Sequence, residues 1–165
     1  MKTEHIVYGS LAVVGTISAI LLIRHFTKSG EIIITTWIKP VEGKLTSGVG
    51  KRIDPVSGKT VQTHNGQDIA VPIGTPVKAP ADATVSSTAS NDAGGKQIVL
   101  VHKNGWFTGY AHLSDVKVQK GQTVKQGQVI ALSGNTGART TGPHLHFTMK
   151  DEKGTTLDPK KYVYT

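Results

Sequence analysis

Glycine and proline divide the sequence after residue 40 into short apolar runs. The whole chain of 165 residues contains 19 glycines and 7 prolines. No stretch of helical periodicity longer than two turns remains between them, whereas several runs have the length and composition of strands. We therefore expect a mainly β fold, built as a compact, turn-rich antiparallel sheet or sandwich.

Four runs are the clearest candidate strands. Gln97–Val101 and Trp106–Leu113 flank Lys103–Gly105, whose Asn-Gly pair is a hairpin signal. Val129–Leu132 is a shorter run that ends at a Ser-Gly-Asn turn. His144–Lys150 alternates strictly between polar and apolar residues, as expected of a strand with one buried face.

The amino-terminal region has a different character. Ile6–Ile23 is a run of 18 residues without a charge, long enough as a helix to span about 27 Å. It ends in Arg24-His25-Phe26, a poor signal-peptide cleavage site, so we predict an uncleaved transmembrane helix. The flanking charges slightly favour a cytoplasmic carboxyl-terminal side. We expect an anchor over 1–28, a linker and first strand over 29–42, with Ile32–Ile38 as the strand, and one domain over 43–165.

Composition excludes several classes of site. The chain has no cysteine, so a disulfide framework, a thiolate zinc finger and a cysteine nucleophile are all excluded. The net charge is +8, and the residues from 31 onward carry 16 Lys+Arg against 10 Asp+Glu, which favours an anionic neighbour. Aromatic residues are few and no basic cluster is interleaved with them, so we do not expect nucleic-acid binding.

Histidines are the candidate chemical groups. His64 precedes Asp68 by four residues, but Gly66 lies between them and prolines follow, so the pair belongs to a loop that enters a strand. A surface histidine near an aspartate is common, and this pair alone is weak evidence for a metal.

The strand candidate at 144–150 is more informative. Its period places His144, His146 and Thr148 on one face, and Leu145, Phe147 and Met149 on the other. Two imidazoles can thus project together while the apolar set packs in the core. Two histidines and one aspartate would suffice for a catalytic zinc site, which uses three protein ligands and leaves one position open. A polar, solvent-facing surface without a ligand is the alternative for this strand alone.

Three segments together resemble the lysostaphin/LytM-type zinc metallopeptidases, enzymes that cut peptide cross-links of bacterial peptidoglycan. The segments occur in the order of that family, and the similarity extends from about Gly43 to Tyr162. They are His64-Asn65-Gly66-Gln67-Asp68, Tyr110-Ala111-His112-Leu113 and Gly142-Pro143-His144-Leu145-His146-Phe147.

The resemblance implies a role for each matching position. His64, Asp68 and His146 match the zinc ligands of the family, and His112 and His144 match its two catalytic histidines. It also implies a small antiparallel β fold with a long groove, a Zn²⁺ cofactor and peptidoglycan peptide cross-links as substrate. We expect a membrane-anchored endopeptidase whose catalytic domain faces the periplasm or cell wall, or one held in a phage virion membrane.

Two other functions fit parts of the sequence. A catalytically silent module of the same fold could use its positive charge to hold the cell wall or activate a hydrolase. Lys120–Ile130 resembles a hairpin repeat of biotinyl- or lipoyl-type carrier domains, although a carrier gives no reason for the histidines. We interpret His102, at the predicted hairpin turn, as structural.

Overall fold

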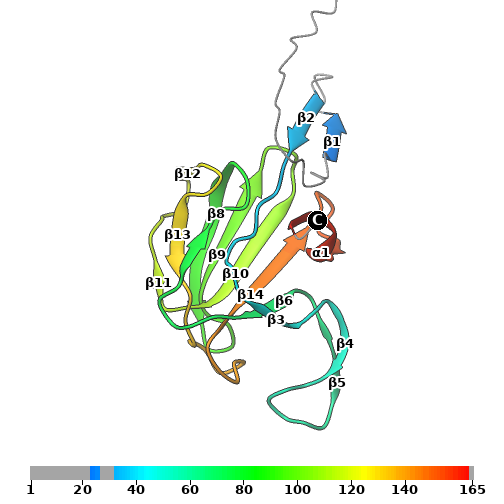
Figure 1. Ribbon diagram of the computed structural model, residues 1–165, viewed down its shortest axis with the longest axis vertical. Coiled ribbons are helices and arrows are strands. Elements are labelled where there is room, and N and C mark those ends of the chain that lie inside the picture. The colour runs from blue at the N-terminus through cyan, green and yellow to red at the C-terminus, as the bar shows by residue number, and fades with distance from the viewer. Residues whose placement is uncertain (1–22, 27–31, 164–165) are drawn as a thin grey trace, which may run out of the picture.

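The computed structural model describes residues 23–26 and 32–163 (Figure 1). The predicted transmembrane helix over Ile6–Ile23 lies outside these residues, except for Ile23, which begins strand β1 (Ile23–Phe26). β1 pairs antiparallel with β2 (Ile32–Thr35), which covers the first four residues of the predicted strand Ile32–Ile38. Within the described part of the chain, no helix is long and apolar enough to cross a membrane.

The domain is organised around one large antiparallel sheet. Its strands lie in the order β12-β8-β9-β10-β14-β6-β3, and β15 also pairs with β14. The predicted hairpin is confirmed, because β9 and β10 are antiparallel neighbours across the turn at Lys103–Gly105. The strands are β3 (Lys44–Ser47), β6 (Gln67–Ala70), β8 (Ala83–Asn91), β9 (Gly95–His102), β10 (Phe107–Leu113), β12 (Thr123–Val124), β14 (His144–Lys150) and β15 (Thr156–Leu157).

Two smaller antiparallel sheets complete the domain. β7 (Pro76–Lys78), β13 (Val129–Leu132) and β11 (Asp115–Val116) form a three-stranded sheet with β13 in the middle. β4 (Gly50–Ile53) and β5 (Val61–His64) form a hairpin that projects from one end of the molecule in Figure 1. The four-residue helix α1 (Lys160–Val163) closes the described chain.

The segment that suggested a carrier domain is divided between these sheets. β12 joins the edge of the large sheet, whereas β13 is the centre of the small one. Lys125, in the turn between them, is paired with Asp82 at 2.9 Å. Because β12 and β13 do not pair with each other, the segment does not form the hairpin that would present a modified lysine at its tip in a carrier domain.

The two larger sheets share one apolar core. In β14 the predicted alternation is confirmed, since Leu145, Phe147 and Met149 are fully buried while the residues between them remain half-buried. Val77 of β7 and Ile130 of β13 belong to the same buried cluster. A fully buried side chain of this size contributes about 1.5–3 kcal/mol, so packing fixes which face of β14 is turned away from the core.

Residues between β2 and β3 also enter this core. Trp37 is buried, stacks on Trp106 at a centroid distance of 5.9 Å, and contacts the edge of His102 at 4.6 Å. The main-chain N–H of Ile38 donates to Pro80 O. This part of the predicted linker is therefore packed as an element of the domain.

Candidate metal centre

Strand pairing brings two of the predicted ligands face to face. β14 pairs with β6 in a register that places His146 directly opposite Asp68. His64 is the last residue of β5, and a tight connection through Gly66 returns the chain into β6. A Cβ on Gly66 would lie 2.6 Å from the carbonyl oxygen of Phe147, so only glycine allows this connection to lie so close to β14.

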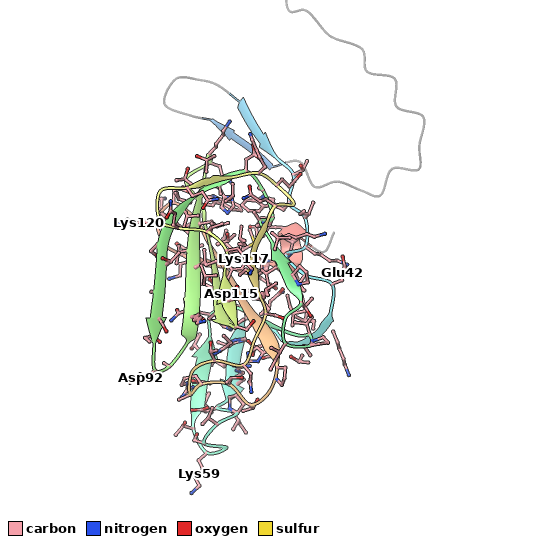
Figure 2. All side chains as sticks on the ribbon, turned by 90° about the vertical axis from the view of Figure 1, so that its left-hand side faces the viewer. Glu42, Lys59, Asp92, Asp115, Lys117 and Lys120 are labelled. Atoms are coloured by element: carbon pink, nitrogen blue, oxygen red, sulfur yellow. The ribbon has the colours of Figure 1, made fainter. Side chains whose placement is uncertain are left out.

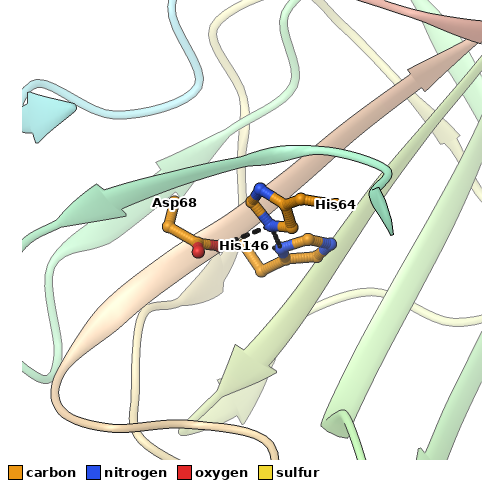
Figure 3. A group of neighbouring side chains, drawn as sticks. All are labelled: His64, Asp68 and His146. Carbon is orange, nitrogen blue, oxygen red and sulfur yellow. Dashed lines mark hydrogen bonds and ion pairs between the residues drawn. The ribbon is translucent and has the colours of Figure 1, made fainter. Parts of the chain in front are cut away.

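The three predicted ligands present their donor atoms to one point (Figure 3). His64 Nε2 lies 3.1 Å from His146 Nδ1, which lies 2.8 Å from Asp68 Oδ1. The third side of this triangle, from His64 Nε2 to Asp68 Oδ1, is 3.2 Å. Ligand atoms about 2.0–2.2 Å from a tetrahedral zinc ion are separated by little more than 3 Å, so this donor set fits zinc.

The second carboxylate oxygen of Asp68 is held by a guanidinium. Arg52 Nη1 donates to Asp68 Oδ2 at 2.7 Å and to Ser47 Oγ at 2.6 Å. Burial by itself would raise the pKa of the Asp68 carboxyl, but contacts with His146, His64 and Arg52 together lower that pKa far below its usual range. Asp68 is therefore ionised, with Oδ1 turned towards the two imidazoles.

Main-chain carbonyls orient three of the site histidines. In each of these rings Nδ1–H donates to one carbonyl oxygen. His64 donates to Gly48 O at 2.8 Å, His112 to Thr136 O at 2.8 Å, and His144 to Gly142 O at 2.7 Å. In the neutral ring Nε2 then carries the lone pair. A carbonyl partner of this kind fixes both the tautomer and the ring orientation of a metal-binding or catalytic histidine.

His112 has an unusual backbone conformation. Its φ is +61°, the one positive value among the described residues other than glycine, and it lies where the β9–β10 pairing is shifted by a bulge. Such a conformation costs about 1–3 kcal/mol and is concentrated at functional sites. Here it directs the imidazole to within 4.7 Å of the His144 ring and 6.1 Å of the His146 ring, measured between centroids. Burial lowers the pKa of the His112 imidazole.

All five predicted site residues line one pocket of about 390 Å³. Its walls include the β4–β5 hairpin on one side and the β8–β9 turn on the other; Lys59 and Asp92 mark these two turns in Figure 2. The predicted groove therefore has a counterpart at the end of the domain where the histidines gather. The lining residues are Arg52, Pro55, Gln62, Thr63, His64, Asn65, Asp68, Asn91, Ala93, Gly94, Gln97, Ala111, His112, Arg139, Thr141, His144 and His146.

His102 lies away from this pocket, in agreement with its interpretation as structural. It is 4% exposed, and its two ring nitrogens lie within hydrogen-bonding distance of Asp82 O and Thr108 Oγ1. Its burial lowers the pKa of the imidazole to about 4.

The sequence patterns did not identify the two pocket arginines. Arg52 reaches a carboxylate 16 positions further along the chain, and Arg139 reaches the β4–β5 hairpin from the loop before β14. A single arginine in a short strand or in a glycine-rich loop has no local signal that predicts its partner.

A mainly β domain whose pocket combines a His-Asp-His donor set with two further imidazoles has the make-up of a metallopeptidase. The sequence model of peptidase family M23 matches residues 62–159. The chain therefore belongs to peptidase family M23, which confirms the resemblance found in the sequence.

Individual relatives agree with this assignment. Peptidoglycan DD-endopeptidase ShyA of Vibrio cholerae is 42% identical over 128 residues, covering 75% of this chain and 29% of that protein. Cell division protein DipM of Caulobacter vibrioides is 35% identical over 147 residues, covering 79% of this chain and 24% of that protein. The matched region thus spans less than a third of these curated relatives.

Solved structures share the fold. A zinc-containing peptidase from Vibrio cholerae superposes with a TM-score of 0.69 at 36% identity, over 82% of this chain and 44% of that one. The catalytic domain of lysostaphin from Staphylococcus simulans gives a TM-score of 0.67 at 34% identity, over 74% of this chain and 93% of that one.

Proposed function

We propose that this protein is a zinc-dependent endopeptidase that hydrolyses peptide cross-links of bacterial peptidoglycan. The observation that carries the proposal is the triangle of donor atoms from His64, Asp68 and His146, with the imidazoles of His112 and His144 beside it. The names of the relatives support the substrate, since ShyA is a peptidoglycan DD-endopeptidase.

The donor triangle is suited to hold the metal. When bound, zinc supplies Lewis-acid polarisation of a peptide carbonyl and activation of water near neutral pH. Asp68 contributes one negative charge through Oδ1, and the Arg52 guanidinium keeps its other oxygen out of the metal position.

His112 and His144 would move the protons. Each ring has its Nδ1–H fixed on a main-chain carbonyl, so each can accept a proton at Nε2 and donate it again. One imidazole can take the proton of the attacking water while the other donates a hydrogen bond to the oxyanion that develops on the peptide carbonyl. Their ring separation of 4.7 Å leaves both next to the same reacting group.

The experiment combines zinc analysis with digestion of purified peptidoglycan. The protein should contain one zinc ion and release cleaved muropeptides, which are identified by mass spectrometry. His146→Ala should lose both zinc and activity. His112→Ala should keep zinc and lose about 100-fold or more in kcat. Thr148→Ala, two residues along the same face of β14, is the matched control and should keep both. Wall binding without zinc or cleavage would instead identify a silent binding module.

The same proposal includes a membrane anchor at Ile6–Ile23, supported by its 18 uncharged residues. The site of action that we propose is the cell-wall side of a bacterial membrane, with the membrane of a phage virion as the alternative. The net charge of the chain suits a neighbouring acidic wall. Membrane fractionation followed by protease accessibility of the domain from outside the cell tests the anchor and its orientation. Detection in purified virions would select the alternative.

A further inference from the structure

Arg139 presents a guanidinium in the wall of the pocket, and the proposed catalytic mechanism does not use it. It lies in the loop between β13 and β14, and its side chain is 43% exposed. Nη1 donates to Asp54 Oδ2 at 3.1 Å and Nη2 donates to Gln62 Oε1 at 2.6 Å. Two partners on the β4–β5 hairpin thus fix the plane of the guanidinium while the side chain stays accessible.

The position of this guanidinium relative to the metal centre follows from strand geometry. Gln62 and His64 lie two residues apart on β5, hence on the same face, at a spacing of about 6.5–7 Å. Arg139 bonds to Gln62 and lines the same pocket as His64, so its guanidinium lies beside the face of β5 that carries the predicted metal ligand.

The charges that line the pocket favour an anionic group at this place. Two arginines line it, and among the lining residues of the described chain Asp68 is the sole carboxylate. Asp68 is already paired with Arg52 at 2.7 Å and belongs to the donor triangle. Asp54 offsets the charge of Arg139, but its side chain is 10% exposed and Asp54 is not among the lining residues, so the pair presents its guanidinium to the pocket. A bound divalent cation would add further positive charge.

The donor chemistry narrows the anion to a planar, two-oxygen group. A guanidinium has five N–H donors, and the contacts with Asp54 and Gln62 use two of them. The remaining donors keep the fork geometry that matches a carboxylate. Asp54 and Gln62 limit the rotation of this fork, which reduces the entropy lost when it binds.

We propose that Arg139 is a specificity residue that binds a free carboxylate on the substrate, close to the bond that is cut. This inference rests on the proposed peptidase function and narrows its substrate class. The preferred cross-links are those formed through a diamino acid whose carboxyl group stays free beside the amide. Bridges without a carboxylate, such as oligoglycine, are poor substrates.

The test uses two synthetic cross-linked peptides that differ only in that carboxyl group, free in one and amidated in the other. The zinc-loaded protein should cleave the free form with a kcat/KM about 10- to 100-fold higher, mainly through KM. Arg139→Gln should reduce this preference to less than about 3-fold. Asp54→Asn removes the hairpin partner but keeps the guanidinium, and it should keep the preference.

The outcomes separate the two proposals. If the unmodified protein cleaves both peptides equally well, the inference about Arg139 is wrong while the peptidase function stands. If it cleaves neither peptide nor purified peptidoglycan, the function itself is wrong. Equal losses on both peptides in Arg139→Gln and Asp54→Asn would show that the ion pair only tethers the hairpin. Should Arg139→Gln not fold, Arg139→Lys keeps the charge without the fork and should still reduce the preference about 3-fold or more.

Discussion

The burial of His102 makes the stability of the fold sensitive to acid. Its Nδ1–H donates to Asp82 O at 3.1 Å, and Nε2 accepts from Thr108 Oγ1 at 2.9 Å. Thr108 Oγ1 in turn accepts from the Tyr110 hydroxyl at 3.0 Å. A neutral imidazole completes this chain of hydrogen bonds. A protonated ring would instead direct a second N–H at the Thr108 hydroxyl, which already donates its own hydrogen to Nε2. Burial, partly offset by the bond to Asp82 O, lowers the pKa of His102 from 6.5 to about 4.

The two pKa values give the magnitude of the effect. Between about pH 6.5 and about pH 4 the unfolded chain binds a proton at His102 that the folded protein does not bind. The stabilisation is therefore complete above about pH 6.5 and is lost as the pH falls. At about 1.4 kcal/mol per pKa unit, the loss is about 2 kcal/mol near pH 5 and about 3 kcal/mol near pH 4.

Urea unfolding of the protein and of His102→Gln across this range measures the loss. Glutamine does not titrate, and it can still donate to Asp82 O and accept from Thr108 Oγ1. Both proteins are unfolded with a chelator present, because acid also weakens metal binding. The free energy of unfolding of the variant should rise relative to the parent by about 3 kcal/mol from about pH 7.5 to about pH 4. A difference that stays constant within about 0.5 kcal/mol would refute the argument.

Three other predictions concern the metal centre. Zinc at about 100 times its dissociation constant should stabilise the protein by about 2.7 kcal/mol in thermal unfolding, and a chelator should reverse this stabilisation. Equal stabilisation of His146→Ala by zinc would exclude the donor triangle as the metal site. Arg52→Met should weaken zinc binding about 10-fold in a competition assay, because Asp68 loses the partner that orients it; unchanged affinity would show that the guanidinium is not needed. Gly66→Ala should destabilise the fold by about 1–3 kcal/mol, because its Cβ would collide with the main chain of β14. Gly48→Ala, with open space around the added Cβ, is the control, and equal losses in the two variants would contradict the packing argument.

Much of the candidate site was predictable because its residues lie in short segments with local signals. The alternation over His144–Lys150 fixed which side chains share a face, and the structure confirms that face. The resemblance of three segments supplied His64, Asp68 and His112, which the fold brings into one pocket with His144 and His146.

The remaining parts of the site depend on contacts between distant segments. The carbonyls that orient the histidines come from Gly48, Thr136 and Gly142, and nothing in a sequence marks a carbonyl as a ligand partner. The positive φ of His112 arises at a bulge between paired strands, which single-strand patterns do not reveal.

The sequence by itself determined the strand periods, the turns and the kind of chemistry, because backbone geometry and residue type act over a few neighbouring positions. Only the tertiary structure decided that β14 lies between β10 and β6, so that His146 faces Asp68 beside the β10 bulge. It also decided that Arg52 pairs with Asp68 while Arg139 lines the pocket from the loop between β13 and β14. Strand order and register are selected by packing of the whole core, and residues far apart in sequence meet only once that packing is complete.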